Sequence, residues 1–483
     1  MYHSATKLTQ SIQSANVTIV DTVKTCLDQI NRHNPAINAI VTLDKENAMN
    51  TATKMDLQIN QNKELPPLFG VPVSIKDSFE TQGIRTTSSY PPLQHYIPNH
   101  DATVVNRLKK AGAIILGKTN LPQLAGDIQC WSPLFGQTNN PWNTNLTSGG
   151  SSGGSAAAIA MNFSFLDIGS DLAGSIRIPA AYCGVAGLKS TENRIPKTGH
   201  IPPLPKAERS VRHLLSLGVL ARCVDDLRLG FNIISGPDGV DSETPPIPTS
   251  TIHFKRTQPL RVAWWDDFNG VPLCHRTKIG LNSTIQQLTE AGMKVERCFP
   301  KQFDFDAAWY AFGIIMGAEI GLGISPVKRF PLSLMSRFLP QSQPLARAFA
   351  AGLSFNWRQY NEALNIRDRL ILQIEQFLEN WDVWLCPVTP SVAFPHQKPG
   401  IFKTPPNILV DDFSMSYLEG TISMTTPFSL TGNPVITLPT GIVEGLPVGV
   451  QIIGKRWNDE ELLNHSHIIE LIINGFQSPP NCF

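Results

Sequence analysis

The stretch SGGSSGGSAAAIAMNFSFLDIGSDLAGSIRIP, residues 148–179, decides how this chain folds. It concentrates glycine and serine, but the alanine run after the glycines is good helix material, which a flexible linker would lack. Ser151 and Ser152 lie between glycine pairs, and Ser175 follows an Asp-Leu-Ala-Gly segment. We expect backbone N–H groups to converge there on a developing negative charge. The pattern therefore predicts a catalytic scaffold built around serines, which needs a base.

Lys76 is the candidate base, because no histidine lies within residues 148–179. It closes the apolar run LFGVPVSIK, residues 68–76, which predicts a buried strand that ends on one charge. Burial lowers the pKa of a lysine by up to ~3–5 units from about 10.4, so a neutral amine near pH 7 can accept a hydroxyl proton. A lone lysine in such a place is more often a surface residue at a strand end, so the assignment depends on the other motifs.

Three motifs together resemble the amidase signature family: GVPVSIKD at 70–77, GGSSGGS at 149–155 and GSIR at 174–177. The likeness covers nearly the whole chain, because four more segments match: NPAINA (34–39), GKTN (117–120), FGQTNNPW (135–142) and GLPVGVQ (445–451). The resemblance implies an α/β fold with a single mixed sheet of many strands, covered by helices on both sides. It also implies an amide hydrolase that works through an acyl-enzyme and needs no cofactor.

By motif position, the family's Ser-(cis-Ser)-Lys triad falls on Ser175 as nucleophile, Ser151 as bridging serine and Lys76 as base. In this scheme neutral Lys76 draws a proton through Ser151 from Ser175, and the proton later returns to the leaving nitrogen. The N–H groups of the loop before and at the nucleophile would hold the oxyanion, and neighbouring side chains would support the site. The oxyanion residues are Leu172, Ala173, Gly174 and Ser175, and the supporting residues are Ser152, Asp171 and Arg177.

The chain departs from the family at Ala173, where a second glycine commonly precedes the nucleophile. If the loop needs a positive φ at that position, the alanine Cβ is strained and activity falls. We interpret the alanine as tolerated variation. A rival motif is G-x-S-x-G at 149–153, the nucleophile elbow of α/β-hydrolases, but that elbow must follow a strand, and the residues before it are turn formers.

The composition favours a small substrate. With 42% hydrophobic and 16% charged residues among 483, the chain can bury a large core, and a net charge of +1 gives no footprint for nucleic acid. The eight cysteines lack C-x-x-C spacing, and His465 and His467 lie two apart on an expected helix, so we expect no disulfide framework and no metal. Without a signal peptide or an 18-residue apolar run, we expect a cytoplasmic protein with no membrane span.

Because the three triad residues must meet in one site and the matching segments continue to residue 451, we expect one catalytic domain over 1–483, with a triad-bearing half at about 1–235 and a C-terminal half at about 258–483. Helices and strands alternate, which is typical of the α/β class. Predicted helices lie at 18–32, 284–291 and 358–378, and predicted strands at 113–116, 163–168, 383–387 and 435–439. Residues 312–355 are apolar and irregular, and they fit core packing as well as they fit the wall of an acyl pocket.

Two functions from the same family compete, while a non-catalytic binding protein is disfavoured because all three triad residue types are present. The main expectation is an amidase that works alone on a small amide, with a homodimer allowed. The alternative is the A subunit of a glutamyl-tRNA amidotransferase, which releases ammonia from glutamine. The resemblance implies that this subunit holds the glutamine amino group with an acid a few positions before its Leu-x-Gly-x-Pro motif; here the position falls near Ile422, and Glu419 is out of register. Arg367 fits a substrate carboxylate or an ion pair equally well.

Overall fold

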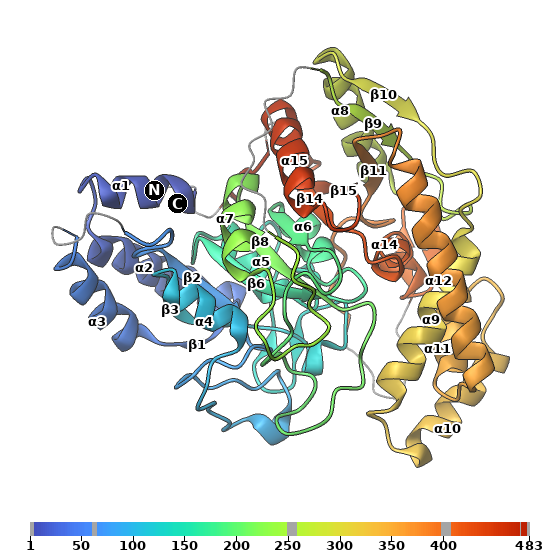
Figure 1. Ribbon diagram of the computed structural model, residues 1–483, viewed down its shortest axis with the longest axis horizontal. Coiled ribbons are helices and arrows are strands. Elements are labelled where there is room, and N and C mark those ends of the chain that lie inside the picture. The colour runs from blue at the N-terminus through green and yellow to red at the C-terminus, as the bar shows by residue number, and fades with distance from the viewer. Residues whose placement is uncertain (1–3, 60–64, 249–257, 398–406, 474, 481–483) are drawn as a thin grey trace.

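An eleven-stranded mixed sheet runs through the computed structural model of the protein (Figure 1), which describes residues 4–59, 65–248, 258–397, 407–473 and 475–480. The strands follow one another across the sheet in the order β1-β3-β2-β6-β8-β7-β14-β15-β11-β9-β10. Their bounds are β1 Ile40–Leu43, β2 Pro72–Lys76, β3 Ile114–Thr119, β6 Leu166–Asp171, β7 Ala186–Lys189, β8 Ser216–Ala221, β9 Arg261–Trp264, β10 Lys294–Arg297, β11 Val383–Pro387, β14 Val435–Val443 and β15 Leu446–Ile453. Two hairpin-like pairs stand apart: β4 Trp131–Ser132 with β5 Gly136–Gln137, and β12 Ile408–Val410 with β13 Phe413–Met415.

The two halves of the chain meet in the middle of this sheet. Strand β7 from the first half pairs antiparallel with β14 from the second half, with Val435 opposite Lys189. Parallel pairs lie toward the two ends of the sheet, β2 with β3 and β6, and β9 with β10 and β11. The chain is therefore a single α/β domain with a mixed central sheet, as expected from the sequence.

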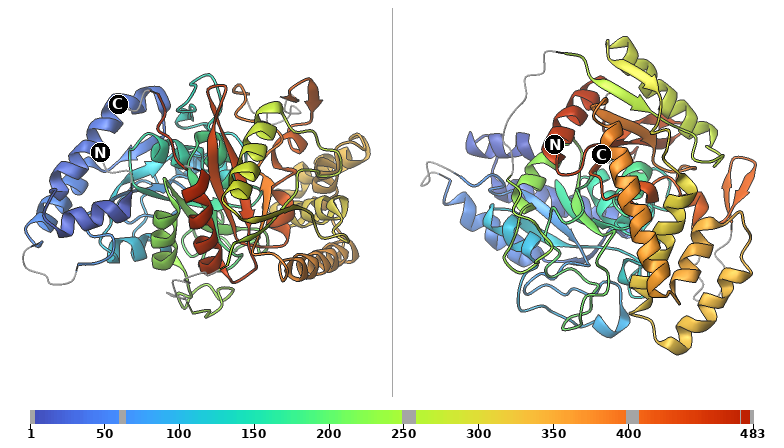
Figure 2. Two further views of the ribbon diagram at one scale, coloured as in Figure 1. Left: turned by 90° about the horizontal axis from the view of Figure 1, so that it is seen from above. Right: turned by 45° about the vertical axis from the view of Figure 1, so that its right-hand side comes forward.

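Helices pack on both faces of the sheet because successive strand residues point to opposite sides. In β11, Val383 and Leu385 join one hydrophobic cluster, whereas Trp384 and Cys386 join the other. Figure 2 shows α8 and α15 on one side, with α9 and α12 outside the other. The helices are α1 Ala5–Gln13, α2 Ile19–Ile37, α3 Lys45–Asp56, α4 Thr103–Lys110, α5 Gly153–Ala160, α6 Arg177–Cys183, α7 Val224–Ile234, α8 His275–Glu290, α9 Phe305–Gly321, α10 Pro326–Leu334, α11 Pro344–Gly352, α12 Trp357–Phe377, α13 Glu419–Ile422, α14 Thr426–Leu430 and α15 Asp459–Ile473.

The expectation of an irregular segment over 312–355 was wrong, because α9, α10 and α11 occupy most of it. The glycines that suggested irregularity let two helices approach closely. A Cβ added to Gly317 on α9 would lie 2.3 Å from the carbonyl oxygen of Phe349 on α11. The prolines Pro326 and Pro344 stand at helix starts, where a missing N–H costs nothing.

The sheet brings the predicted catalytic residues to one edge. Strands β2 and β6 are parallel neighbours, with Ile75 opposite Ile168. Lys76 is the last residue of β2, and the loop that carries Ser175 starts where β6 ends. Carboxyl ends of parallel strands share an edge, which is where open α/β sheets place their ligands.

In the described residues, no helix combines the length and the apolar character that crossing a membrane requires. Seven of the eight cysteines are free thiols, and Cys482 lies outside the described residues.

Candidate active site

Lys76 is enclosed at the end of β2, with no exposed surface. Its Nζ donates hydrogen bonds to the hydroxyls of Ser151 at 2.7 Å, Ser152 at 2.9 Å and Ser170 at 3.1 Å. The structure thus brings the predicted base and the predicted bridging serine into direct contact. It also places Ser152, expected only in support, within hydrogen-bond distance of the same amine.

Burial lowers the pKa of Lys76 from 10.5 to about 7. The nearby acidic groups of Cys130, Asp171 and Asp167 act in the opposite direction, but loss of water outweighs them. At neutral pH a large share of Lys76 is therefore the free amine, the form that accepts a proton from a serine hydroxyl.

Two other lysines are fully buried with lowered pKa values, yet neither meets these serines. The Lys118 ammonium donates to Thr81 and Thr86 hydroxyls, each at 3.0 Å. The Lys189 ammonium donates to the Asn433 carbonyl at 2.8 Å. Both are occupied in holding neighbouring loops, which leaves Lys76 as the buried amine beside the serine block.

The serine block is a loop that turns directly into α5. The peptide bond between Gly150 and Ser151 is cis, and residues 138–152 hold only isolated β-bridges, so the strand that a nucleophile elbow requires is absent from this described segment. The Ser152 N–H donates to the Ser175 carbonyl at 3.0 Å, which ties the two serine loops together. Ser151 and Ser175 are 1% and 6% exposed, so little water reaches either hydroxyl.

Asp171 shapes the loop that carries Ser175. Its carboxylate accepts hydrogen bonds from the N–H groups of Gly174 at 2.8 Å and Ile176 at 3.0 Å. Arg177 donates to both carboxylate oxygens, at 2.9 and 3.0 Å, and neither side chain is exposed. Burial alone would raise the pKa of Asp171, but the Arg177 charge and these hydrogen bonds lower it to about 2. Asp171 and Arg177 therefore both stay charged at every working pH, and their ion pair holds the loop in place.

This arrangement changes one expectation for the oxyanion loop. The Gly174 N–H points at Asp171, so it is committed to holding the loop and is not free for an oxyanion. The positive φ of the loop, 117°, also falls on Gly174, whereas Ala173 has no left-handed backbone. The concern about strain at Ala173 therefore does not apply, because its Cβ sits on an ordinary backbone conformation.

Sequence reasoning missed three residues that form hydrogen bonds between distant parts of the chain, and one of them, Thr425, contacts this loop. The Thr425 hydroxyl donates to the Ala173 carbonyl at 2.6 Å. The Tyr417 hydroxyl donates to the Asp127 carboxylate at 2.6 Å. No local sequence pattern predicts either contact, because the two partners are separated by 252 and 290 positions in the sequence.

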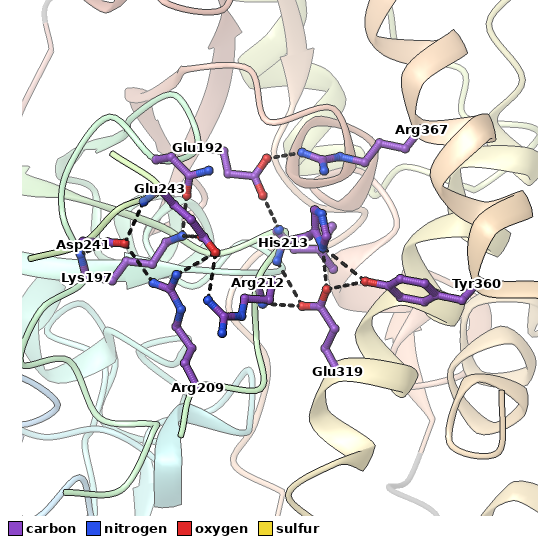
Figure 3. A network of polar contacts seen from close by, with 12 residues as sticks. Glu192, Lys197, Arg209, Arg212, His213, Asp241, Glu243, Glu319, Tyr360 and Arg367 are labelled. Atoms are coloured by element: carbon purple, nitrogen blue, oxygen red, sulfur yellow. Dashed lines mark hydrogen bonds and ion pairs between the residues drawn. The ribbon is translucent and has the colours of Figure 1, made fainter. Parts of the chain in front are cut away.

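The structure resolves the open role of Arg367. Figure 3 shows its guanidinium against Glu192, with which it forms a buried ion pair, and its Nε donates to the Leu430 carbonyl at 2.7 Å. Arg367 is thus an ion-pair residue in these contacts. Glu419 is also buried, and it accepts from the Ala346 N–H at 3.2 Å and from the Ser416 hydroxyl.

The family model for amidases matches residues 21–463 of the chain. The A subunit of glutamyl-tRNA(Gln) amidotransferase from Exiguobacterium sibiricum is 30% identical over 99% of this chain and 98% of its own length, and the Geobacillus stearothermophilus protein of the same name is 30% identical over 99% of both. Among solved structures, a chain from a vestigial protein complex related to the origins of an s-triazine catabolic enzyme has a TM-score of 0.79 at 27% identity, covering 98% of this chain and 99% of its own. The Thermotoga maritima amidotransferase chain of that same A-subunit type has a TM-score of 0.72 at 25% identity, covering 93% of both chains.

These similarities correct the expectation about partners. The near-neutral charge favoured a small amide as the partner, and the missing acid near Ile422 favoured a chain that works alone, with a homodimer allowed. The similar proteins are instead named as one subunit of a larger enzyme, and they match over nearly their whole length. Net charge misses such an association because subunits meet through shape and local apolar contacts.

Proposed function

Because this chain belongs to the amidase family, whose members cleave amide C–N bonds, we propose that it does so through an acyl-enzyme on Ser175. One observation carries the proposal: the buried Lys76 amine lies 2.7 Å from the Ser151 hydroxyl. With its pKa lowered to about 7, that amine is available as a base near neutral pH.

In the proposed reaction, Lys76 takes the Ser151 proton while Ser151 takes the proton of Ser175. The Ser175 Oγ then bonds to the amide carbon, and N–H groups of Leu172, Ala173 and Ser175 hold the oxyanion. When the C–N bond breaks, the proton returns through Ser151 to the leaving nitrogen. Water repeats the same steps on the ester and releases the acid.

We propose glutamine as the amide and ammonia as the product, with the chain serving as the A subunit of an amidotransferase. The support is the run of similar proteins with that name, each matching this chain along nearly its whole length. In that role the chain would assemble with further subunits that use the ammonia.

A hydrolase of a different amide is the second candidate, and one observation favours it. Ile422 lies buried where the resemblance implies an acid for the glutamine amino group. A buried ammonium without a carboxylate forfeits about 1.5–3 kcal/mol of charged hydrogen bonding.

The test measures ammonia release by the purified protein from glutamine and from a panel of other primary amides, with Ser175→Ala as the blank. We expect glutamine to be cleaved, and the chain to co-purify with the other subunits when they are expressed together. Cleavage of other amides but not glutamine would favour the second candidate. A folded protein inert on every amide, whose Ser175 resists a fluorophosphonate probe by mass spectrometry, would overturn the acyl-enzyme itself.

A further inference from the structure

Asp127 lies close to the serine block, although it belongs to a separate loop of the chain. The segment that follows it packs on the backbone of the block: a Cβ on Gly150 would lie 2.8 Å from the carbonyl carbons of Ile128 and Gln129. With about 3.8 Å between consecutive Cα atoms, this contact keeps the Cα of Asp127 within about 13 Å of that of Ser151. The Asp127 and serine side chains take up part of this distance, so an acyl chain of a few carbons can bridge what remains.

A second contact joins Asp127 to Tyr417, at the start of the run 417–425. Tyr417 donates its hydroxyl to the Asp127 carboxylate at 2.6 Å, and the Ile128 N–H donates to the same oxygen at 2.7 Å. The chain then continues from Tyr417 to Thr425, whose hydroxyl holds the Ala173 carbonyl at 2.6 Å. Asp127 is therefore fixed by the serine block on one side and by the run 417–425 on the other.

The Tyr417 ring, whose hydroxyl contacts this carboxylate, belongs to a row of three aromatic side chains. The ring centroids of Tyr417 and Phe394 are 6.4 Å apart, and those of Phe394 and Tyr182 are 6.1 Å apart, each pair close to perpendicular. Tyr182 contacts the serine block through its ring, and Phe394 contacts the residue just before the block through its backbone. A Cβ on Gly149 would lie 3.2 Å from Cδ2 of Tyr182, and the Phe394 carbonyl accepts from the Thr147 N–H at 2.9 Å.

The Asp127 carboxylate has no cationic partner among the described residues: its hydrogen-bond donors are a tyrosine and backbone N–H groups. It is partly exposed, in contrast to the fully buried Asp171 that Arg177 neutralises. Burial raises the pKa of Asp127 against these hydrogen bonds, so an approaching cation would be favourable. Such a carboxylate suits an ammonium group, which gains a charged hydrogen bond from it.

We propose that Asp127, held by Tyr417, binds a positively charged amino group on the acyl part of the substrate. This inference rests on the proposed amide cleavage and names the class of amide: one whose acyl chain carries an ammonium group. For glutamine that group is the α-ammonium. Asp127 would then supply the carboxylate that Ile422 cannot provide.

The test uses two substrate pairs that differ only in the amino group: glutamine with 4-carbamoylbutanoic acid, and 6-aminohexanamide with hexanamide. In Asp127→Asn we expect the preference for the amino-bearing member, measured as a ratio of kcat/KM values, to fall about tenfold to a hundredfold, mainly through KM. Tyr417→Phe should lower the same ratio less, because the carboxylate stays. Glu419→Gln, which alters another buried acid on the run 417–425, should leave the ratio unchanged.

Six outcomes of these measurements decide the matter. If Asp127→Asn lowers kcat/KM equally on both members of a pair, Asp127 only supports the fold and the inference is wrong. An unchanged ratio in Asp127→Asn would also overturn the inference, and so would a wild type that does not prefer the amino-bearing substrates. If Asp127→Asn fails to fold, an unchanged ratio in Tyr417→Phe overturns it. Wild type that prefers 6-aminohexanamide but ignores glutamine would refute the glutamine assignment while supporting the ammonium subsite. Cleavage of glutamine with an unchanged ratio in Asp127→Asn would support the glutamine assignment and refute the ammonium subsite at Asp127.

Discussion

The Lys76 Nζ lies 2.7 Å from the Ser151 Oγ, and the two side chains are 0% and 1% exposed. A charged ammonium would be costly in such a place, because water cannot solvate it. The serine hydroxyls around it accept hydrogen bonds but carry no negative charge. The site thus favours the neutral amine that proton abstraction requires.

The first prediction concerns pH. Because burial lowers the pKa of Lys76 to about 7, kcat/KM should be low below pH 6, rise through about pH 7, and level off above pH 8 as the amine loses its proton. Lys76→Arg should remove this rise together with most of the activity, since arginine stays protonated. A pH–rate profile of both proteins checks it. An identical rise in Lys76→Arg would assign the titration to another group.

A second prediction separates the two serines that Lys76 contacts at 2.7 and 2.9 Å. If Ser151 alone relays the proton, Ser151→Ala should lower kcat by about 10²–10⁴-fold. Ser152→Ala, which removes the neighbouring contact and leaves the relay, should lose less than about tenfold. Single-turnover acylation rates of the two variants give the comparison. Equal losses would mean that the amine works through both hydroxyls.

The third prediction concerns the oxyanion loop, where Gly174 has φ 117° and a Cβ would lie 2.7 Å from Ile178 Cδ1 and from Thr425 Oγ1. Gly174→Ala should therefore displace the loop and reduce kcat by about 10²-fold or more. The matched variant Ala173→Gly changes one methyl group in the same loop and should stay within about threefold, because residue 173 has no left-handed backbone. Steady-state kinetics on one amide decide between them, and similar losses in both would contradict this account.

The sequence predicted the contact between Lys76 and Ser151, because each of the two residues sits in a local pattern. An apolar run that ends on Lys76 predicts a buried strand end, and the glycine-serine block before an alanine run predicts a loop that leads into a helix. Parallel pairing of β2 and β6 then brings Lys76 and the loop that carries Ser175 to one edge. These local patterns are reliable here because the strands and the helix that they predict are present in the structure.

The remaining features depend on partners that no local pattern identifies. Arg367 falls on a helical stripe whether it binds substrate or Glu192, and only the tertiary structure shows the ion pair. Likewise, the commitment of the Gly174 N–H to Asp171 follows from the way the loop folds back on its own carboxylate. Glycine and proline in α9 to α11 led to the wrong prediction because they permit close helix packing and helix starts as readily as irregular structure.

The last prediction concerns stability and the buried pair of Asp171 and Arg177. Both side chains are 0% exposed, and Asp171 accepts from Arg177 at 2.9 Å and from the loop N–H groups as well. Asp171→Asn removes the charge partner of a buried guanidinium, so the free energy of unfolding should fall by about 3–5 kcal/mol. Glu444→Gln makes the same chemical change in a pair with Arg276 whose side chains are 57% and 36% exposed, and it should cost at most about 1 kcal/mol. Denaturant unfolding at pH 7 measures both changes.

Because Arg177 and the loop hydrogen bonds hold the pKa of Asp171 at about 2, below its ordinary value of 3.8, the pair's contribution to the free energy of unfolding is present above pH 4 and is lost as the pH falls through about 2. The difference between wild type and Asp171→Asn should therefore shrink below pH 3, and a difference that stays constant down to pH 2 would show that the pair is not the source of the stability.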